Sequence, residues 1–303
     1  MNYPTEKVFD HLRALAVRFF ALIQDLDARR KLMDHYFRVH PSTSEIEGEW
    51  YPVRTGHIPM EWVVANGVDP NRRILYIHGG SWISGSPSGY RAFLSRVSQA
   101  AKAVVLSVDY RLAPEHLFPA GLEDCVQAYQ WVRKNGPDGK EPAGATYLMG
   151  DSAGGNLALA ALLKVRDSRL ALPEAVIAIS PATDFTCGSP SLVSRAGVDP
   201  IINPAILPAL IPVYLGTNTQ PTNPYASPLF GDYSGMPPLL LQVGDAEVLL
   251  DDSTRLAKHA AEQGCEVTLE VWDGMPHVFQ GFAPFLPEAS EAIAKIGEFI
   301  RQH

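Results

Sequence analysis

Cysteine is scarce in this sequence, and its few positions exclude two kinds of stabilised scaffold. Cys125, Cys187 and Cys265 are the only cysteines among 303 residues. They are odd in number and widely spaced, and no C-x-x-C pair occurs, so the pattern predicts neither a disulfide framework nor a zinc knuckle. No H-E-x-x-H or other zinc pattern links the nine histidines. We therefore expect buried free thiols in a reducing compartment and no metal site.

Long apolar runs and an excess of positive charge are also missing. No apolar run approaches the roughly 18 residues of a membrane span, and the first residues, MNYPTEKVFDH, lack the basic and apolar parts of a signal peptide. The formal net charge of −8 would repel nucleic acid and anionic lipid. The sequence thus predicts a cytoplasmic protein with no nucleic-acid partner and no stable membrane insertion. It is compatible with a homodimer but does not predict an oligomeric state.

Short apolar runs alternate with helical patterns from Met60 onward. The expected strands are MEWVVA, RILYIHG, AVVLSVDY, ATYLMG, AVIAIS, PLLLQVG and VTLEVW, and segments such as GLEDCVQAYQWV and AGGNLALAALLKV between them have a helical pattern. Strands that are apolar on both faces and alternate with helices are typical of a mostly parallel sheet covered on two sides. The fold class is therefore α/β, with a central sheet flanked by helices.

Two segments fall outside this alternation. In the N-terminal segment (residues 1–45), apolar residues from Val8 to Leu26 recur at steps of three and four, which predicts an amphipathic helix that packs on the protein's own body. The proline-rich segment (residues 181–238) shows no clear strand, and a helix begun at Asn203 would be kinked or broken by its prolines. We expect both segments to form a helical cap over a site on the α/β domain (residues 46–303).

The motif GDSAGG, residues 150–155, stands between an expected strand and an expected helix. A G-x-S-x-G match alone is weak, but on a sharp strand-to-helix turn the serine needs a strained backbone and the glycines remove colliding side chains. The free N–H groups of the helix that follows suit a developing oxyanion. This context predicts that Ser152 is a nucleophile and that the N–H of Ala153 stabilises the oxyanion.

A glycine loop, HGGSWISG at residues 78–85, directly follows the strand RILYI. Gly80 and Gly85 have the spacing of a phosphate-binding loop, but Ser86 stands where that loop needs a lysine, which argues against a nucleotide site. Small residues let backbone N–H groups approach a substrate oxygen. We expect Gly79 and Gly80 to complete the oxyanion hole with Ala153.

The third motif, DGMPHVF at residues 273–279, contains the best candidate for a general base. His277 is the only histidine placed after a late strand of the expected sheet and between turn residues. The other histidines lie in polar segments, in a helix or at the terminus. His277 is therefore expected to remove the proton of Ser152.

Together the motifs HGGSW, VDYRLAPEHLFPA, GDSAGGNLA and HVF resemble those of the bacterial hormone-sensitive-lipase-like esterases of the α/β-hydrolase fold. The resemblance runs from about Trp50 to the C-terminus. It implies a carboxylesterase that acts on short- to medium-chain carboxylic esters through an acyl-enzyme, without metal or organic cofactor. Lactones and acetylated small molecules are alternative substrates. It also implies that Tyr110–His116 supports the oxyanion loop without taking part in the chemistry.

The third member of the triad is harder to assign, because the stretch GDAEVLLDD offers four carboxylates. In the family, the acid begins a D-P-L-x-D sequence, and EVLLD lies in that register, so the position is occupied by Glu247. Asp245 is the alternative, two residues earlier and with less loop to turn toward His277. Asp251 or Asp252 is expected to cap the following helix.

Two other classes of protein share the fold that the resemblance implies. A non-catalytic ligand receptor usually lacks the base, whereas this chain retains candidates for serine, acid and histidine. A peptidase of this fold usually carries a large accessory domain, which nothing in the sequence resembles. An esterase is the interpretation that the sequence favours.

Overall fold

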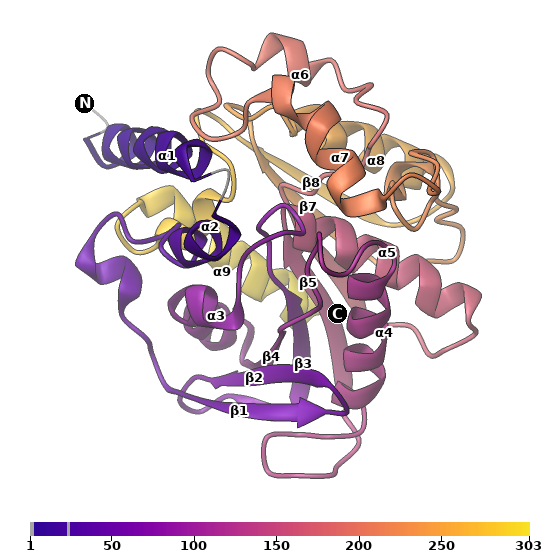
Figure 1. Cartoon of the computed structure of the whole chain (residues 1–303). Helices are drawn as coiled ribbons and strands as arrows, with labels where there is room; N and C mark the ends of the chain where they lie inside the picture. Colours follow the sequence, from indigo (N-terminus) through magenta and orange to yellow (C-terminus); the bar gives the residue numbers. More distant parts are fainter. Residues whose placement is uncertain (1–2, 23–24) are drawn as a thin grey trace.

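One sheet between two layers of helices forms the body of the protein (Figure 1). The structure is a computed structural model and describes residues 3–22 and 25–303. The described residues form eight strands in the spatial order β1-β2-β4-β3-β5-β6-β7-β8. Strand β2 runs antiparallel to its neighbours β1 and β4, and all other neighbouring pairs are parallel, as the alternating pattern predicts. The strands are β1 (Glu49–Thr55), β2 (Ile58–Val64), β3 (Asp69–Ile77), β4 (Ala103–Val108), β5 (Ala145–Asp151), β6 (Ala175–Ile179), β7 (Leu239–Gly244) and β8 (Val267–Trp272).

Each face of the sheet is buried under its own helices. Helices α3 (Pro87–Ala101) and α9 (Pro287–Gln302) share one core with the sheet, and α4 (Ala120–Val132), α5 (Ala153–Asp167) and α8 (Leu250–Glu262) share the other. In β5, Leu148 belongs to the core under α4 and α5, whereas Tyr147 and Met149 belong to the core under α3. All three side chains are fully buried, so the strand is apolar on both faces because both faces are covered.

The N-terminal segment forms two helices, and the predicted helix from Val8 to Leu26 ends earlier than expected. Helix α1 (Tyr3–Ala21) ends before the predicted limit at Leu26, and α2 (Leu26–Met33) begins there. The Asp25 side chain accepts a hydrogen bond from the N–H of Ala28 at 2.9 Å, which caps α2 and starts a new helix. Residues 23–24, inside the predicted helix, lie outside the described residues. Val8, Leu12 and Leu15 are buried against the protein's own body, in agreement with the prediction.

The proline-rich segment contains short helical pieces and, among the described residues, no strand. These are α6 (Ser191–Ser194), the 3₁₀ turns η2 (Pro204–Ile206) and η3 (Pro228–Phe230), and α7 (Leu207–Leu215). Asn203 caps η2 through its side chain, and the 3₁₀ turn passes into α7, which tolerates one interior proline, Pro212. The predicted broken helix is therefore confirmed. Two further 3₁₀ turns are η1 (Pro41–Ser44) and η4 (Phe279–Phe282).

The predicted cap of α8 is wrong. Leu249 occupies the N-cap position, with no side-chain hydrogen bond, and the two aspartates lie in the first turn of the helix. Asp252 is buried and accepts hydrogen bonds from the N–H groups of Thr183 and Asp184, because a buried carboxylate is stable only with donors around it. Its carboxylate ties the start of the proline-rich segment to α8.

Two elements were absent from the sequence prediction, and the cysteines can be compared with the expected buried free thiols. Edge strand β1 and the C-terminal helix α9 were not predicted. The cysteines are free: Cys125 and Cys265 are buried, whereas Cys187 is partly exposed. Within the described part of the chain, no helix combines the length and apolar character that crossing a membrane requires.

Candidate active site

Ser152 stands on a sharp turn between β5 and α5. Its φ of 53° and ψ of −120° lie outside the ordinary regions for a residue with a side chain. A Cβ added at Gly150 would lie 2.3 Å from the Gly154 carbonyl oxygen, and one at Gly154 would lie 2.0 Å from that of Ile77. Only glycine fits at these two positions, so the motif allows the close packing that holds Ser152 in its strained turn.

His277 lies in the loop between β8 and η4, with its ring directed at Ser152. The His277 Nε2 atom is 2.9 Å from the Ser152 Oγ atom, within hydrogen-bond distance. The ring is only 5 % exposed. The structure thus brings together a hydroxyl and an imidazole that are 125 positions apart in the sequence.

Glu247, in the loop after β7, contacts the other nitrogen of His277. Its Oε2 atom is 2.6 Å from His277 Nδ1. The second oxygen, Oε1, accepts hydrogen bonds from the N–H of Gly244 at 2.6 Å and from the Ser180 hydroxyl at 2.8 Å. The Glu247 side chain is fully buried. Such a carboxylate can hold the imidazole in one tautomer and balance its charge.

The surroundings of His277 favour its charged form. Burial of the ring by itself lowers the pKa, but the charge of Glu247 and its hydrogen bond outweigh burial, with smaller contributions from Asp199 and Asp151. The net result is a pKa of His277 raised above its ordinary value of 6.5. A base of this kind accepts a proton readily.

Asp245, the alternative acid, has a different role. One of its carboxylate oxygens accepts a hydrogen bond from the N–H of Gly274 at 2.7 Å, and its own N–H donates to the Trp272 carbonyl at 3.0 Å. Its other oxygen is 3.8 Å from Arg195. Asp245 therefore fastens the turn that leads to His277, and the carboxylate that touches the ring is that of Glu247.

The glycine loop differs from the prediction at one residue. The Gly79 N–H donates to Asp151 Oδ1 at 2.8 Å and to the Tyr90 hydroxyl at 3.1 Å, so it is not free to bind a substrate oxygen. The buried carboxylate of Asp151, beside the nucleophile, thus occupies this donor. The predicted role of Gly79 disagrees with this geometry. In the part of the chain that the structure describes, the N–H groups of Gly80, Ser81 and Ala153 donate to no protein group.

Asp151 and Tyr36 are part of the site but were not predicted. Burial raises the pKa of Asp151, although hydrogen bonds from the Tyr76 and Tyr90 hydroxyls and the Gly79 N–H oppose that effect. Tyr36, in the N-terminal segment, donates its hydroxyl to the backbone carbonyl of His277 at 2.9 Å. Asp151 could have been singled out as the residue before the nucleophile, whereas no sequence pattern marks Tyr36.

The segment Tyr110–His116 supports the glycine loop. The Tyr110 hydroxyl donates to the His78 carbonyl at 2.9 Å, and the Ala113 N–H donates to the Trp82 carbonyl at 2.9 Å. Arg30 of α2 binds Glu115 through two nitrogens and also donates to the Ile83 carbonyl at 2.9 Å. Glu115 and His116 are exposed and lie outside the pocket.

An apolar pocket opens above Ser152. It encloses about 890 Å³, including the space open to solvent, and its lining includes Gly80, Ser81, Ser152 and His277. Its apolar lining includes Phe19, Phe20 and Met33 from the N-terminal segment and Ile201, Ile202 and Leu210 from the proline-rich segment. Both segments outside the α/β alternation thus meet at the same pocket. Within residues 3–22 and 25–303, no three His, Cys, Asp or Glu side chains are grouped so that they could hold a metal ion.

Known proteins share both the sequence and the fold. Residues 74–281 match the family described as alpha/beta hydrolase fold. An acetyl-hydrolase of Streptomyces hygroscopicus is 43 % identical over 82 % of this chain and 81 % of its own length. An esterase of Acinetobacter venetianus is 34 % identical over 90 % of this chain and 88 % of its own.

A solved structure extends the similarity to the whole chain. The crystal structure of an esterase from the bacterial hormone-sensitive lipase family superimposes with a TM-score of 0.91 and 39 % identity, and the match covers 100 % of this chain and 98 % of that one. Relatives named as esterases favour an enzyme over the non-catalytic receptor. The chain therefore belongs to the α/β-hydrolase fold family, among the bacterial hormone-sensitive-lipase-like esterases, and it is a carboxylesterase of the serine hydrolase class.

Proposed function

We propose that this carboxylesterase hydrolyses short- to medium-chain esters through a covalent ester on Ser152. His277 removes the hydroxyl proton as Ser152 Oγ attacks the substrate carbonyl, and the leaving alcohol takes that proton when the tetrahedral intermediate collapses. Water, with His277 again as base, then attacks the acyl-enzyme and releases the acid. Glu247 orients the imidazole and balances its charge. The chemistry requires no metal or organic cofactor.

One observation carries this proposal. An unbroken line of hydrogen-bond distances runs from Ser152 Oγ to His277 Nε2 at 2.9 Å and from His277 Nδ1 to Glu247 Oε2 at 2.6 Å. A nucleophile, a base and a group that orients the base are the parts that acyl transfer through a serine needs.

We assign the oxyanion hole to the backbone N–H groups of Gly80, Ser81 and Ala153. These donors have no other partner in the described residues, and Gly80 and Ser81 line the pocket beside Ser152. Donors held in place before the reaction stabilise the charge that develops on the carbonyl oxygen. Ser81 has a side chain where Gly79 and Gly80 have none, but its backbone N–H remains available as a donor.

We propose that residues 46–303 form the catalytic domain. The N-terminal segment and the proline-rich segment, which is an insertion in this domain, form a cap over its active site. Their apolar side chains line the same pocket as the polar groups, which suits the acyl chain of an ester. A cytoplasmic location, a homodimer and the absence of a nucleic-acid partner remain predictions from the sequence.

Acetylated small molecules are a second candidate substrate class, together with lactones. The Streptomyces hygroscopicus relative is named an acetyl-hydrolase. The same triad would cleave either kind of ester, because in both the serine attacks a carbonyl carbon and the bond from that carbon to an alcohol oxygen breaks. In a lactone, that alcohol stays attached to the acyl group.

A chain-length series tests the proposal. p-Nitrophenyl esters from acetate to decanoate, run beside an aminoacyl anilide, should give the highest kcat/KM at short to medium length and no cleavage of the anilide. Preference for the anilide would identify a peptidase instead. A maximum of kcat/KM at decanoate would contradict the proposed preference for short- to medium-chain esters.

A further inference from the structure

Glu247 poses a positioning problem that the family's usual aspartate does not. A glutamate has one more rotatable bond, so fixing its carboxylate against His277 costs more side-chain entropy. Glu247 also lies in a short loop between the end of β7 at Gly244 and the start of α8 at Leu250. The bonds from Gly244 and Ser180 fix the carboxylate, and the backbone of the loop needs its own support.

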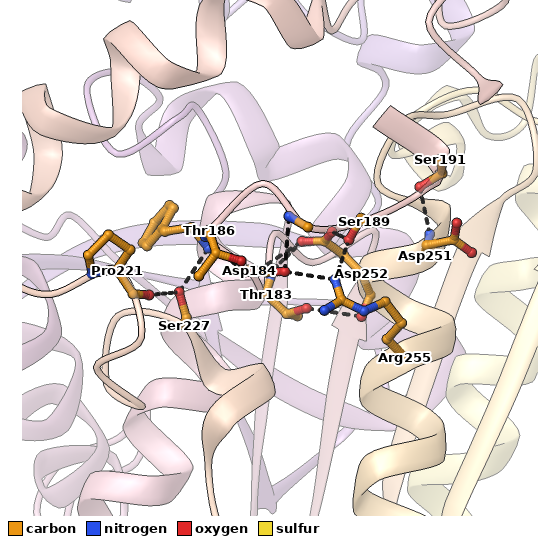
Figure 2. Close-up of polar contacts among 12 residues, drawn as sticks. Thr183, Asp184, Thr186, Ser189, Ser191, Pro221, Ser227, Asp251, Asp252 and Arg255 are labelled. Atoms are coloured by element: carbon orange, nitrogen blue, oxygen red, sulfur yellow. Dashed lines mark hydrogen bonds and ion pairs between the residues drawn. The ribbon is translucent and has the colours of Figure 1, made fainter. Parts of the chain in front are cut away.

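The proline-rich segment provides that support through hydrogen bonds to the next residue, Val248. The Ser191 hydroxyl donates to the Val248 carbonyl at 2.6 Å and accepts from the Asp251 N–H at 2.9 Å. The Val248 N–H donates to Asp199 Oδ2 at 2.9 Å. Ser191 and Val248 are almost fully buried. Figure 2 shows Ser191 directed from its short helix toward Asp251 at the start of α8.

We propose that Ser191 and Asp199 are positioning residues for the triad acid, because together they hold both backbone polar groups of Val248, the residue that follows Glu247. This inference rests on the proposed function, since it assumes that Glu247 orients His277. It gives the proline-rich segment a part in catalysis as well as in lining the pocket.

Asp199 joins the pocket wall to the acid loop. Its Oδ1 atom accepts from the N–H groups of Ile201 and Ile202, at 2.9 and 2.8 Å, and both isoleucines line the pocket. One carboxylate therefore fixes the wall against which substrate lies and the loop that carries the acid. Movement of the segment would disturb both.

The Asp199 charge also acts on the base. The titratable groups that influence His277 are the carboxylates of Glu247, Asp199 and Asp151, and the buried Tyr36 hydroxyl donates to its carbonyl. Asp199 faces His277 from the proline-rich segment and Tyr36 from the N-terminal segment. Burial raises the pKa of Asp199, while the charge of His277 lowers it. On its own segment, Arg195 pairs with Asp245 at 3.8 Å.

Ser227 offers a matched control for Ser191. It is a buried serine of the same segment, and its hydroxyl likewise accepts from one N–H, that of Phe185 at 2.8 Å, and donates to one carbonyl, that of Pro221 at 2.6 Å. Figure 2 shows the Ser227–Pro221 bond away from the Ser191–Asp251 pair. Replacing either serine by alanine removes the same two kinds of hydrogen bond.

The test compares kcat, KM and thermal stability of Ser191→Ala and Ser227→Ala with the parent. Both should lose similar stability. Ser191→Ala should lower kcat about tenfold, because a misplaced acid loop displaces the base, with KM within about twofold. Ser227→Ala should keep kcat within about twofold of the parent. Equal losses of kcat in the two variants, or none in Ser191→Ala, would overturn the proposal.

Asp199→Asn provides an independent measurement that does not depend on Ser191→Ala being folded. The amide keeps one of the two oxygens, so it can still accept either from Ile201 and Ile202 or from Val248. It removes the charge that raises the pKa of His277, so the acid side of the kcat/KM profile should move to lower pH. A purely structural aspartate would leave that limb where it is, and an unmoved limb would overturn the role of Asp199. Ser152→Ala, measured in parallel, distinguishes a failure of the proposed function from a failure of the positioning role. Turnover in Ser152→Ala contradicts the proposed function itself, whereas parent-like Ser191→Ala beside inactive Ser152→Ala contradicts only the positioning role.

Discussion

The polar groups and the apolar side chains that line the pocket are held by different means. Among the polar groups, Ser152 is fixed by a strained turn and two glycines, and His277 by hydrogen bonds on both ring nitrogens. The apolar wall is made of side chains from helices α1 and α7 and their flanking turns, such as Phe20 and Leu210. The side chains of this wall can offer a substrate only apolar contacts, although Asp199 holds the backbone at two of its residues.

Because of this difference, we expect the polar groups to determine the rate of the reaction and the apolar wall to determine which esters are preferred. Preorganised donors and charges lower the barrier of the reaction, and their loss should reduce kcat for every ester. An apolar wall discriminates among substrates only through the methylene groups that it accommodates, so a change there should alter the ratio between esters. The predictions below test whether the polar groups and the apolar wall can be disturbed separately.

The largest effect is expected at the nucleophile. Ser152→Ala should leave a folded protein in which kcat for p-nitrophenyl esters is about 10⁶ lower, the loss typical when such a nucleophile is removed. Circular dichroism and thermal melting check the fold. Appreciable turnover in the folded variant would show that another group attacks the ester.

The next largest effect should distinguish the two acids after β7. Glu247→Gln keeps the shape of the side chain but removes its charge, so kcat should fall by a factor approaching about 10⁴, as in the serine-protease example for the loss of such a partner. Asp245→Asn should cost far less in kcat, and part of its effect should be lower stability, because Asp245 holds the Gly274 N–H. If Asp245→Asn were the crippled variant and Glu247→Gln nearly normal, Asp245 would be the triad acid.

The pH dependence should reflect His277. The base must be neutral in the free enzyme, and its pKa is raised by the Glu247 carboxylate, so kcat/KM should fall as the pH drops through a value above the ordinary 6.5. Below that point the fall is about tenfold per pH unit. Initial rates followed in a pH-stat provide the profile, and a flat profile down to pH 5 would argue against His277 as the base.

The smallest of these effects is expected at the apolar wall. Leu210 lies between the pocket and a smaller neighbouring cavity of about 370 Å³, and it lines both. Leu210→Ala should join the two spaces and change the ratio of kcat/KM between octanoate and acetate about tenfold in favour of octanoate, with kcat for acetate within about twofold. Val213→Ala, on the same helix but exposed and outside the pocket, serves as control. An unchanged ratio in Leu210→Ala would mean that this wall does not select for chain length.

The sequence could predict residues that belong to a local pattern, but not those that act through distant contacts. Ser152, His277 and the sheet carry local patterns, because a strained turn needs glycine and a buried strand needs apolar residues on both faces. Tyr36, Ser191 and Asp199 act on the site through hydrogen bonds to residues far along the chain, and the spacing of residues in the sequence does not predict such contacts. Gly79 shows the opposite error, since its motif was recognised but the buried Asp151 takes its N–H.

Helix ends were the other weak point. The register of apolar residues continued past Ala21 toward Leu26, but capping by Asp25 divided the stretch into α1 and α2. Asp252 stood where a cap is usual, yet it is turned to the N–H groups of Thr183 and Asp184. The cap at Asp25 is a local hydrogen bond, whereas the tertiary structure supplies the partners of Asp252.

The central claim is that Ser152 carries the acyl group, and covalent labelling tests it most directly. An organophosphate that reacts with activated serines should add one group per chain, and mass spectrometry of the digested protein should find it on the peptide containing Ser152 and on no other. Loss of activity should follow the extent of labelling. A label on a different residue, or full labelling with activity retained, would contradict the account.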